Sequence, residues 1–227
     1  MKKVIGGTMF NCELEYLEKI FENCPEARID GYSAGDIENS FDLQPKDFLN
    51  FAELDIQKDD FHHLVNCLTN SKRAIECQID SLLFRFGLLE ISRKKRWFFP
   101  EKIEVLNQIG IISPRILTKV NSLRNFLEHR YSKPEKEKVE DALDVALLFI
   151  GYTDRYLKNT VTGFVILDPI EGRCDMTLDH ENNKIVFNLL VLNETTNEYE
   201  GKLIKEVEAN SGKYLDYVKW YLGQSIM

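Results

Sequence analysis

Apolar side chains between residues 57 and 158 recur mostly three or four positions apart, which is typical of helices with one buried face. This spacing predicts four helices, over residues 59–87, 101–111, 113–131 and 134–157. Gly87 is a natural end for the first helix, because glycine readily adopts the left-handed conformation of a helix stop. Within that helix, Asn70 and Ser71 either cap a break or lie inside one continuous helix.

After residue 159 the apolar positions alternate with a period of two, which indicates strands with one buried face. Four strands are predicted, over residues 164–167, 175–178, 184–192 and 199–206. Residues 179–183 and 193–197 supply the turn-forming side chains that two hairpins need. Gly212 precedes a last helix or strand, and the whole pattern predicts a small antiparallel sheet.

The first 56 residues carry the weakest pattern. Residues 13–24 have helical spacing that ends at Pro25, whereas residues 40–50 show no clear period around Pro45. We therefore expect an N-terminal appendage, an up-and-down helical bundle and a C-terminal antiparallel β subdomain, over residues 1–56, 57–158 and 159–227. The predicted fold class is mainly α with a small α+β extension.

The helix predicted over residues 113–131 combines an apolar stripe with an unusual polar face. The stripe consists of Ile116, Val120, Leu123 and Leu127. Asn125 and His129 are four positions apart, so they share a face on the opposite side. Arg124 lies five positions before His129 and points about 140° away from it. One helix therefore cannot easily focus both side chains on one ligand atom, whereas two copies related by a two-fold axis can.

Arg124-Asn125, three further residues and His129 resemble the R-x4-6-H signature of HEPN domains, in which a polar residue commonly follows the arginine. The continuation to Tyr131 reads R-x4-H-x-Y, which is similar to HepT-type toxins that are paired with minimal nucleotidyltransferases. A motif helix, a short turn marked by Pro134 and a long closing helix resemble the HEPN order of helices. The resemblance covers under half of the chain and leaves the predicted sheet outside it.

The resemblance implies a homodimeric, metal-independent endoribonuclease of the toxin or bacterial defence type, without a cofactor. His129 can take the proton of a ribose 2′-hydroxyl or protonate a leaving 5′-oxygen, because histidine titrates near neutrality. Arg124 can stabilise charge on the phosphate, and Asn125 can orient His129 or hold a phosphate. Such cleavage leaves a 2′,3′-cyclic phosphate. The structural alternative is an arginine–carboxylate pair and a surface histidine.

Tyr131 has two interpretations. In HepT-type toxins the equivalent tyrosine receives AMP from the cognate nucleotidyltransferase, which shuts the toxin off. The resemblance thus implies Tyr131 as a modification site, and a nucleotidyltransferase-type antitoxin as a partner besides RNA. An added phosphodiester beside His129 repels a substrate phosphate. The alternative is a tyrosine that packs at the end of its helix.

Two other functions stay open beside the nuclease. One is a non-catalytic HEPN module that binds RNA, a nucleotide or a protein partner, which the acidic C-terminal part and the predicted sheet favour. The other is a structural dimer whose motif side chains form a polar interface network. The intact arginine, asparagine and histidine of the motif favour the nuclease.

Charge is unevenly spread along the chain. The net charge is −8, and residues 161–227 hold six Lys and Arg against eleven Asp and Glu, which leaves −3 for residues 1–160. The first part also contains four consecutive basic residues, Arg93, Lys94, Lys95 and Arg96, followed by Trp97, Phe98 and Phe99. This basic cluster can hold phosphates while the aromatics stack on bases. The alternative is a solvated loop whose aromatic side chains turn inward.

The remaining patterns mainly exclude functions. No apolar run approaches transmembrane length and the N-terminus lacks a signal-peptide core, so we expect a soluble, cytoplasmic protein without membrane contact. His63 and Cys67 have a spacing that metal sites use, but no further ligand supports them and no metal site is predicted. The motifs of P-loop NTPases, dinucleotide-binding folds, zinc proteases and α/β-hydrolases do not occur.

Overall fold

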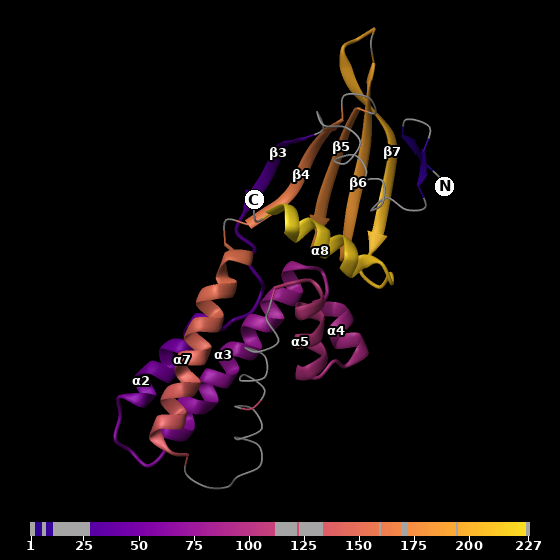
Figure 1. Cartoon of the computed structure of the whole chain (residues 1–227). Coiled ribbons are helices and arrows are strands. Elements are labelled where there is room, and N and C mark those ends of the chain that lie inside the picture. The colour runs from indigo at the N-terminus through magenta and orange to yellow at the C-terminus, as the bar shows by residue number, and fades with distance from the viewer. Residues whose placement is uncertain are drawn as a thin grey trace. The chain divides into compact units, whose positions relative to one another are not determined.

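The computed structural model describes residues 3–5, 8–10, 28–111, 122, 134–158, 160–168, 172–193 and 195–225. The chain forms two compact units, of which one comprises residues 36–159 and the other residues 1–35 together with residues 160–227. The first is called the helical unit and the second the sheet unit (Figure 1). Helices together with an antiparallel sheet confirm the coarse fold class that the sequence predicts.

The helical unit is organised around one long helix. Its described elements are α2 (Pro45–Ile56), α3 (His63–Arg85), α4 (Leu89–Lys95), α5 (Phe99–Gln108), α7 (Lys136–Thr153) and the 3-10 helix η1 (Asp154–Tyr156). Helices α2 and α7 lie side by side with α3 and contact it along its length (Figure 1). The shorter helices α4 and α5 follow the C-terminal end of α3 and contact it there.

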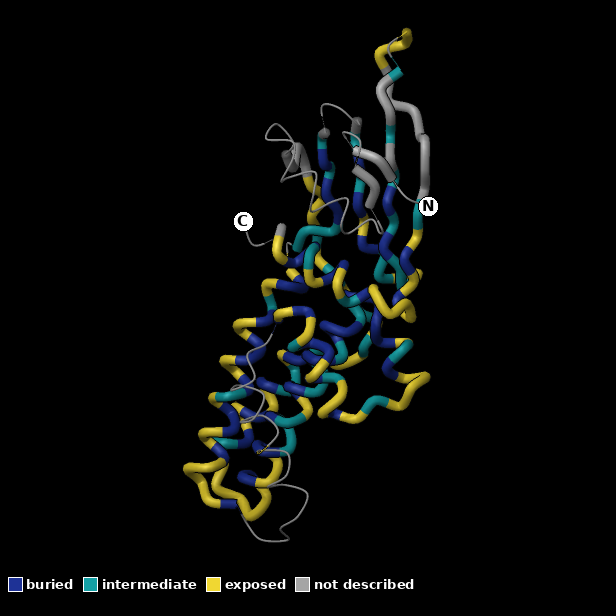
Figure 2. Tube along the Cα trace, turned by 45° about the vertical axis from the view of Figure 1, so that its right-hand side comes forward, coloured by how far each residue is buried: buried dark blue, intermediate teal, exposed yellow. Residues whose placement is uncertain are grey.

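The core of the helical unit follows the predicted helical stripes (Figure 2). The apolar positions predicted for the closing helix are all buried on α7: Val139, Ala142, Leu143, Ala146 and Ile150. Those of the second half of α3 and its C-cap are also buried: Ile75, Ile79, Leu82 and Phe86. Burial of each large aliphatic side chain stabilises the fold by about 1.5–3 kcal/mol, so these stripes hold the helices together.

Helix α3 is continuous and ends where the sequence predicts. Ser71 lies inside it, buried, and its hydroxyl donates to the carbonyl oxygen of Cys67 at 2.9 Å, so the alternative of a break is wrong. Gly87 has a φ of 65°. The amide of Gly87 donates to Phe84 O and that of Leu88 to Leu83 O, which together form a Schellman stop.

The sheet unit contains a five-stranded antiparallel sheet covered by one helix. Its strands, in spatial order, are β3 (Arg28–Gly35), β4 (Thr160–Asp168), β5 (Gly172–Asp179), β6 (Lys184–Asn193) and β7 (Glu198–Glu208). The four strands predicted after residue 159 are therefore confirmed. A separate hairpin joins β1 (Lys3–Ile5) to β2 (Thr8–Phe10).

Helix α8 (Tyr214–Ser225) lies across one face of the sheet (Figure 1), so the last element is a helix and not a strand. Two of its tyrosines pack on sheet phenylalanines, Tyr221 on Phe164 with ring centres 4.8 Å apart and Tyr217 on Phe187 at 5.4 Å. The Tyr221 hydroxyl donates to Val161 O at 2.7 Å, which satisfies its polar end inside the core.

The first 56 residues are arranged differently from the expected appendage. Residues 28–35 form β3, which pairs with β4, and residues 45–56 form α2, which packs on α3. The segment is thus divided between the two units. Strand pairing uses backbone groups and needs no side-chain period, and Pro45 begins α2 at a position where proline is favoured. The predicted helix over residues 13–24 lies outside the described residues.

Candidate functional site

The four side chains of the motif helix lie outside the described residues: Arg124, Asn125, His129 and Tyr131. Their roles therefore stay predictions. The described elements on either side of that segment are α5, after which Ile111 is buried, and α7, before which Pro134 is buried. Both belong to the helical unit, so the motif falls between two elements of one compact body.

The basic cluster is described, and it is part of a helix where the sequence indicated a linking loop. Arg93, Lys94 and Lys95 form the last turn of α4, and Arg96 is its C-cap. Cations are favoured at this end of a helix, because they face the partial negative charge of its carbonyl groups. All four side chains are exposed, and Arg93 pairs with Glu90 at 2.8 Å. The cluster is therefore accessible to an anionic partner.

The three aromatic residues after the cluster do not share one environment. Phe99 is buried in the first turn of α5, whereas Phe98 is 69% exposed and Trp97 is half-buried. The alternative of inward-turned aromatics thus holds for Phe99 and is wrong for Phe98. An exposed aromatic ring beside lysines and arginines is the combination that stacks on a base while cations hold the backbone.

Arg96 has a backbone conformation that is uncommon for residues other than glycine. Its φ is 54° and its ψ 48°, in the left-handed region. Its amide donates to Arg93 O, and the Trp97 amide donates to Ser92 O, so Arg96 is the turning residue of a Schellman stop. The left-handed conformation costs about 1–2 kcal/mol for a residue with a Cβ. At this position the chain has a strained arginine where glycine would be free of strain, and Arg96 is thereby the fourth cation of the cluster.

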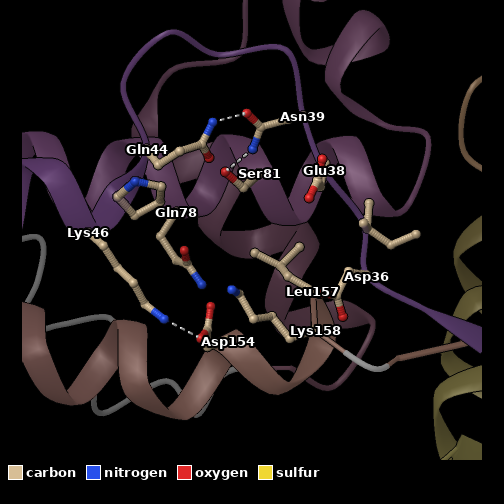
Figure 3. Close-up of a pocket in the computed structure, with 12 residues that line it drawn as sticks. Asp36, Glu38, Asn39, Gln44, Lys46, Gln78, Ser81, Asp154, Leu157 and Lys158 are labelled. Atoms are coloured by element: carbon tan, nitrogen blue, oxygen red, sulfur yellow. Dashed lines mark hydrogen bonds and ion pairs between the residues drawn. The ribbon is translucent and has the colours of Figure 1, made fainter.

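A cleft of about 410 Å³ lies elsewhere in the helical unit (Figure 3). It is formed by the segment before α2, the first turn of α2, the middle of α3 and the chain around η1. No residue of the cleft is among the predicted site residues. Its polar side chains come from three distant parts of the chain, and no motif joins them, so sequence reasoning had no signal to follow.

One wall of the cleft is a closed network of polar side chains. Asn39 donates from Nδ2 to Ser81 Oγ at 2.8 Å, and its Oδ1 accepts from Gln44 Nε2 at 3.0 Å. Gln44 Nε2 also donates to Phe41 O at 2.8 Å. The Ile37 amide donates to Leu157 O at 2.7 Å, which holds the segment before α2 against the end of η1. These bonds give the wall a defined shape.

The cysteines of α3 are not activated for chemistry. Burial raises the pKa of the Cys67 thiol to about 11, and burial likewise raises the pKa of the Cys77 thiol to about 11. Both are therefore protonated at neutral pH and are poor nucleophiles. Within the part of the chain that the structure describes, no three His, Cys, Asp or Glu side chains gather as a metal site, and His63 and Cys67 have no third ligand.

Comparisons of the chain with protein-family models, with curated proteins and with solved structures found no match. The resemblance to HEPN domains therefore stays a prediction from the motif and from the predicted order of helices. Among the described elements, no helix is both long and apolar enough to span a membrane.

Proposed function

We propose that the protein is a metal-independent endoribonuclease of the HEPN type that acts as a homodimer. The observation that carries the proposal is the spacing of Arg124, Asn125 and His129 in a predicted helix of the helical unit. A two-fold axis brings two such sets of side chains together at one composite site between the two copies. A single helix cannot do this, because its Arg124 and His129 point in different directions.

The chemistry needs only the side chains of the motif. His129 of one copy takes the proton from a ribose 2′-hydroxyl, whose oxygen attacks the adjacent phosphorus. The bond to the 5′-oxygen breaks, and that oxygen takes a proton from His129 of the second copy. Arg124 stabilises the negative charge that develops on the phosphate, and Asn125 orients the imidazole. The products are a 2′,3′-cyclic phosphate and a free 5′-hydroxyl.

Two features of the helical unit support this proposal. A long early helix, α3, contacts a long closing helix, α7, and the motif segment precedes α7 in the chain. The exposed basic cluster with Phe98 belongs to the same unit and offers a surface for the RNA backbone and a base.

Regulation through Tyr131 belongs to the same proposal. AMP attached to this tyrosine by a nucleotidyltransferase-type antitoxin places a negative charge two positions from His129. We expect such a modification to lower cleavage by excluding the substrate phosphate. Phosphodiesterase treatment of a modified sample then restores the activity.

The decisive experiment is cleavage of total cellular RNA by the purified full chain in EDTA. Loss of general acid–base catalysis lowers a rate by about 100-fold or more, so His129→Ala is expected to be nearly inactive. His62→Ala is the matched control, because His62 is an exposed histidine at the start of α3. A wild type that cuts only when divalent cations are supplied contradicts the metal-independent mechanism.

A second candidate function is a non-catalytic module that binds RNA. The observation that favours it is the exposed basic cluster beside the exposed Phe98 ring. In that case the wild type and His129→Ala bind RNA equally and neither cleaves it. The variants Arg96→Ala and Phe98→Ala then distinguish phosphate contacts from base stacking. Arg96→Ala is expected to reduce the salt dependence of binding, and Phe98→Ala is expected to leave it unchanged.

A further inference from the structure

The side chain of Gln78 presents a hydrogen-bond acceptor to the cleft of the helical unit. Gln78 lies on α3 and is 1% exposed, and its Nε2 donates to Thr153 Oγ1 at 2.9 Å. The Thr153 hydroxyl donates its own hydrogen to Phe149 O at 2.8 Å, so it can only accept from Gln78. The orientation of the amide is thereby set, and its carbonyl oxygen is the free end.

That carbonyl oxygen accepts no hydrogen bond from the residues that the structure describes. Figure 3 shows the Gln78 amide inside the cleft, between Ser81 on one side and Asp154 and Lys158 on the other. This oxygen is not fully buried, so a donor inside the cleft can reach it, and the neighbouring Asn39 and Ser81 are bonded to each other. The cleft therefore offers an acceptor to a ligand that carries an N–H or O–H donor.

The charges around the cleft select the class of ligand. Three carboxylates, of Asp36, Glu38 and Asp154, and two ammonium groups, of Lys46 and Lys158, line it. Lys46 and Asp154 neutralise each other at 2.7 Å. Among the described residues, Lys158 and Glu38 form no ion pair. A group with two negative charges meets more carboxylates than cations here, whereas a ligand with one charge of each sign matches a lining that holds both signs.

Size and apolar surface narrow the class further. Ile37, Pro45 and Leu157 contribute apolar walls, and the volume of about 410 Å³ lies in the range of sites for small organic ligands. A bare zwitterion leaves most of that space and all of that apolar surface unused. The ligand therefore carries an apolar side chain as well.

We propose that this cleft binds a free α-amino acid with an apolar side chain. Its ammonium group donates to the carbonyl oxygen of Gln78, and its carboxylate pairs with Lys158. The side chain packs on Ile37 and Leu157. This site is separate from the motif of Arg124 and His129, so it stands or falls independently of the proposed nuclease.

The test is isothermal titration calorimetry of the full chain with L-leucine and L-phenylalanine. We expect a Kd of about 1 mM or tighter for at least one of them. N-acetylation removes the ammonium group and amidation removes the carboxylate, and each is expected to weaken binding by about tenfold or more. Equal heats for the blocked and the unblocked amino acids overturn the assignment of the two charged ends.

Two variants assign the binding to the cleft. Lys158→Ala changes an exposed side chain and is expected to weaken binding about tenfold, while Lys136→Ala, at the opposite end of α7, leaves it unchanged. Gln78→Met keeps the volume and removes the acceptor, and it is expected to abolish binding. A thermal melt shows whether the Gln78→Met variant is folded. If it is unfolded, the effect of Lys158→Ala on binding alone tests the assignment to the cleft.

Other outcomes identify a different occupant. Binding of AMP or inorganic phosphate that Lys158→Ala abolishes assigns the cleft to a phosphate and overturns the proposal. Binding of putrescine that survives Lys158→Ala assigns it to a cation, with the same consequence. If none of these probes releases heat or raises the melting temperature, the cleft holds water only and the proposal is wrong.

Discussion

The two units of this protein obtain their cores in different ways. The helical unit is one uninterrupted stretch of chain, residues 36–159, and its core consists of aliphatic stripes on α3 and α7. The sheet unit joins the two ends of the chain, since Ser33 on β3 bonds to Thr162 on β4 across 129 positions. Strands β4 to β7 pair with their neighbours along the chain, so β3 is the strand of this sheet that depends on a distant contact, and such contacts form more slowly.

The core stripe of α3 gives the largest expected effect. Leu82 is 0% exposed, so Leu82→Ala is expected to lower the free energy of unfolding by about 2–5 kcal/mol, through lost burial and the cavity left behind. Urea denaturation followed by circular dichroism measures this loss. Leu148→Ala is the control, because Leu148 on α7 is 74% exposed and its loss leaves no cavity. Equal destabilisation by both variants contradicts the assigned core.

The sheet unit is expected to be sensitive at Gly163 instead. A Cβ placed there lies 3.0 Å from Met176 O and 3.1 Å from Ser33 Oγ, so a side chain pushes against both neighbouring strands. Gly163→Val is expected to lower the free energy of unfolding by about 1–3 kcal/mol, measured as a lower urea midpoint by circular dichroism. Gly35→Ala is the control, because nothing lies within 4 Å of its Cβ. If Gly163→Val is as stable as the wild type, strands β3 and β5 make room for the side chain without a loss of stability.

A smaller effect of opposite sign is expected at the end of α4. Arg96→Gly relieves the left-handed strain and is expected to raise the free energy of unfolding by up to about 1 kcal/mol. Arg96→Ala removes the same charge and keeps the strain, so the difference between the two variants isolates the backbone effect. If the cluster binds RNA, both variants lose affinity equally. Equal stability of the two variants argues against a strained Arg96.

A dependence of stability on alkaline pH is expected in the helical unit. Burial raises the pKa of both Cys67 and Cys77 from the ordinary 9.0 to about 11. The folded thiols keep their protons where unfolded thiols lose them, so their contribution to stability is complete below pH 9 and declines between about pH 9 and pH 11. Urea midpoints at several pH values measure the decline, and Cys67→Ala with Cys77→Ala should flatten it. An unchanged slope in the double variant shows that the decline belongs to groups other than these two thiols.

Part of the fold was predictable because residues three or four positions apart share one face of a helix, so the buried face appears as a local pattern. The stripe of α7 and the stop at Gly87 depend on residues within a few turns of one another, and both predictions are confirmed. Phe61 and Val65, which have the same local spacing at the start of α3, are exposed instead. Local spacing shows which side chains share a face and does not show whether another element covers that face.

The candidate sites divide in the same way. The basic cluster could be predicted from four consecutive basic residues in the sequence. Only the packing of α5 shows that Phe98 is exposed and Phe99 is buried. The cleft was not visible at all, because Gln78 reads as one polar residue within a helix. Its role depends on Thr153, which lies 75 positions away and takes only one end of the amide.

The sequence by itself determined the helical stripes, the strands after residue 159, the helix stop at Gly87 and the spacing of Arg124 and His129. Each of these follows from near neighbours along the chain, whose geometry the backbone repeat sets. Only the tertiary structure decided that residues 28–35 complete the sheet and that three distant segments enclose the cleft. Both outcomes depend on contacts between segments that are far apart in the sequence. The local spacing of apolar residues does not show which of these segments meet.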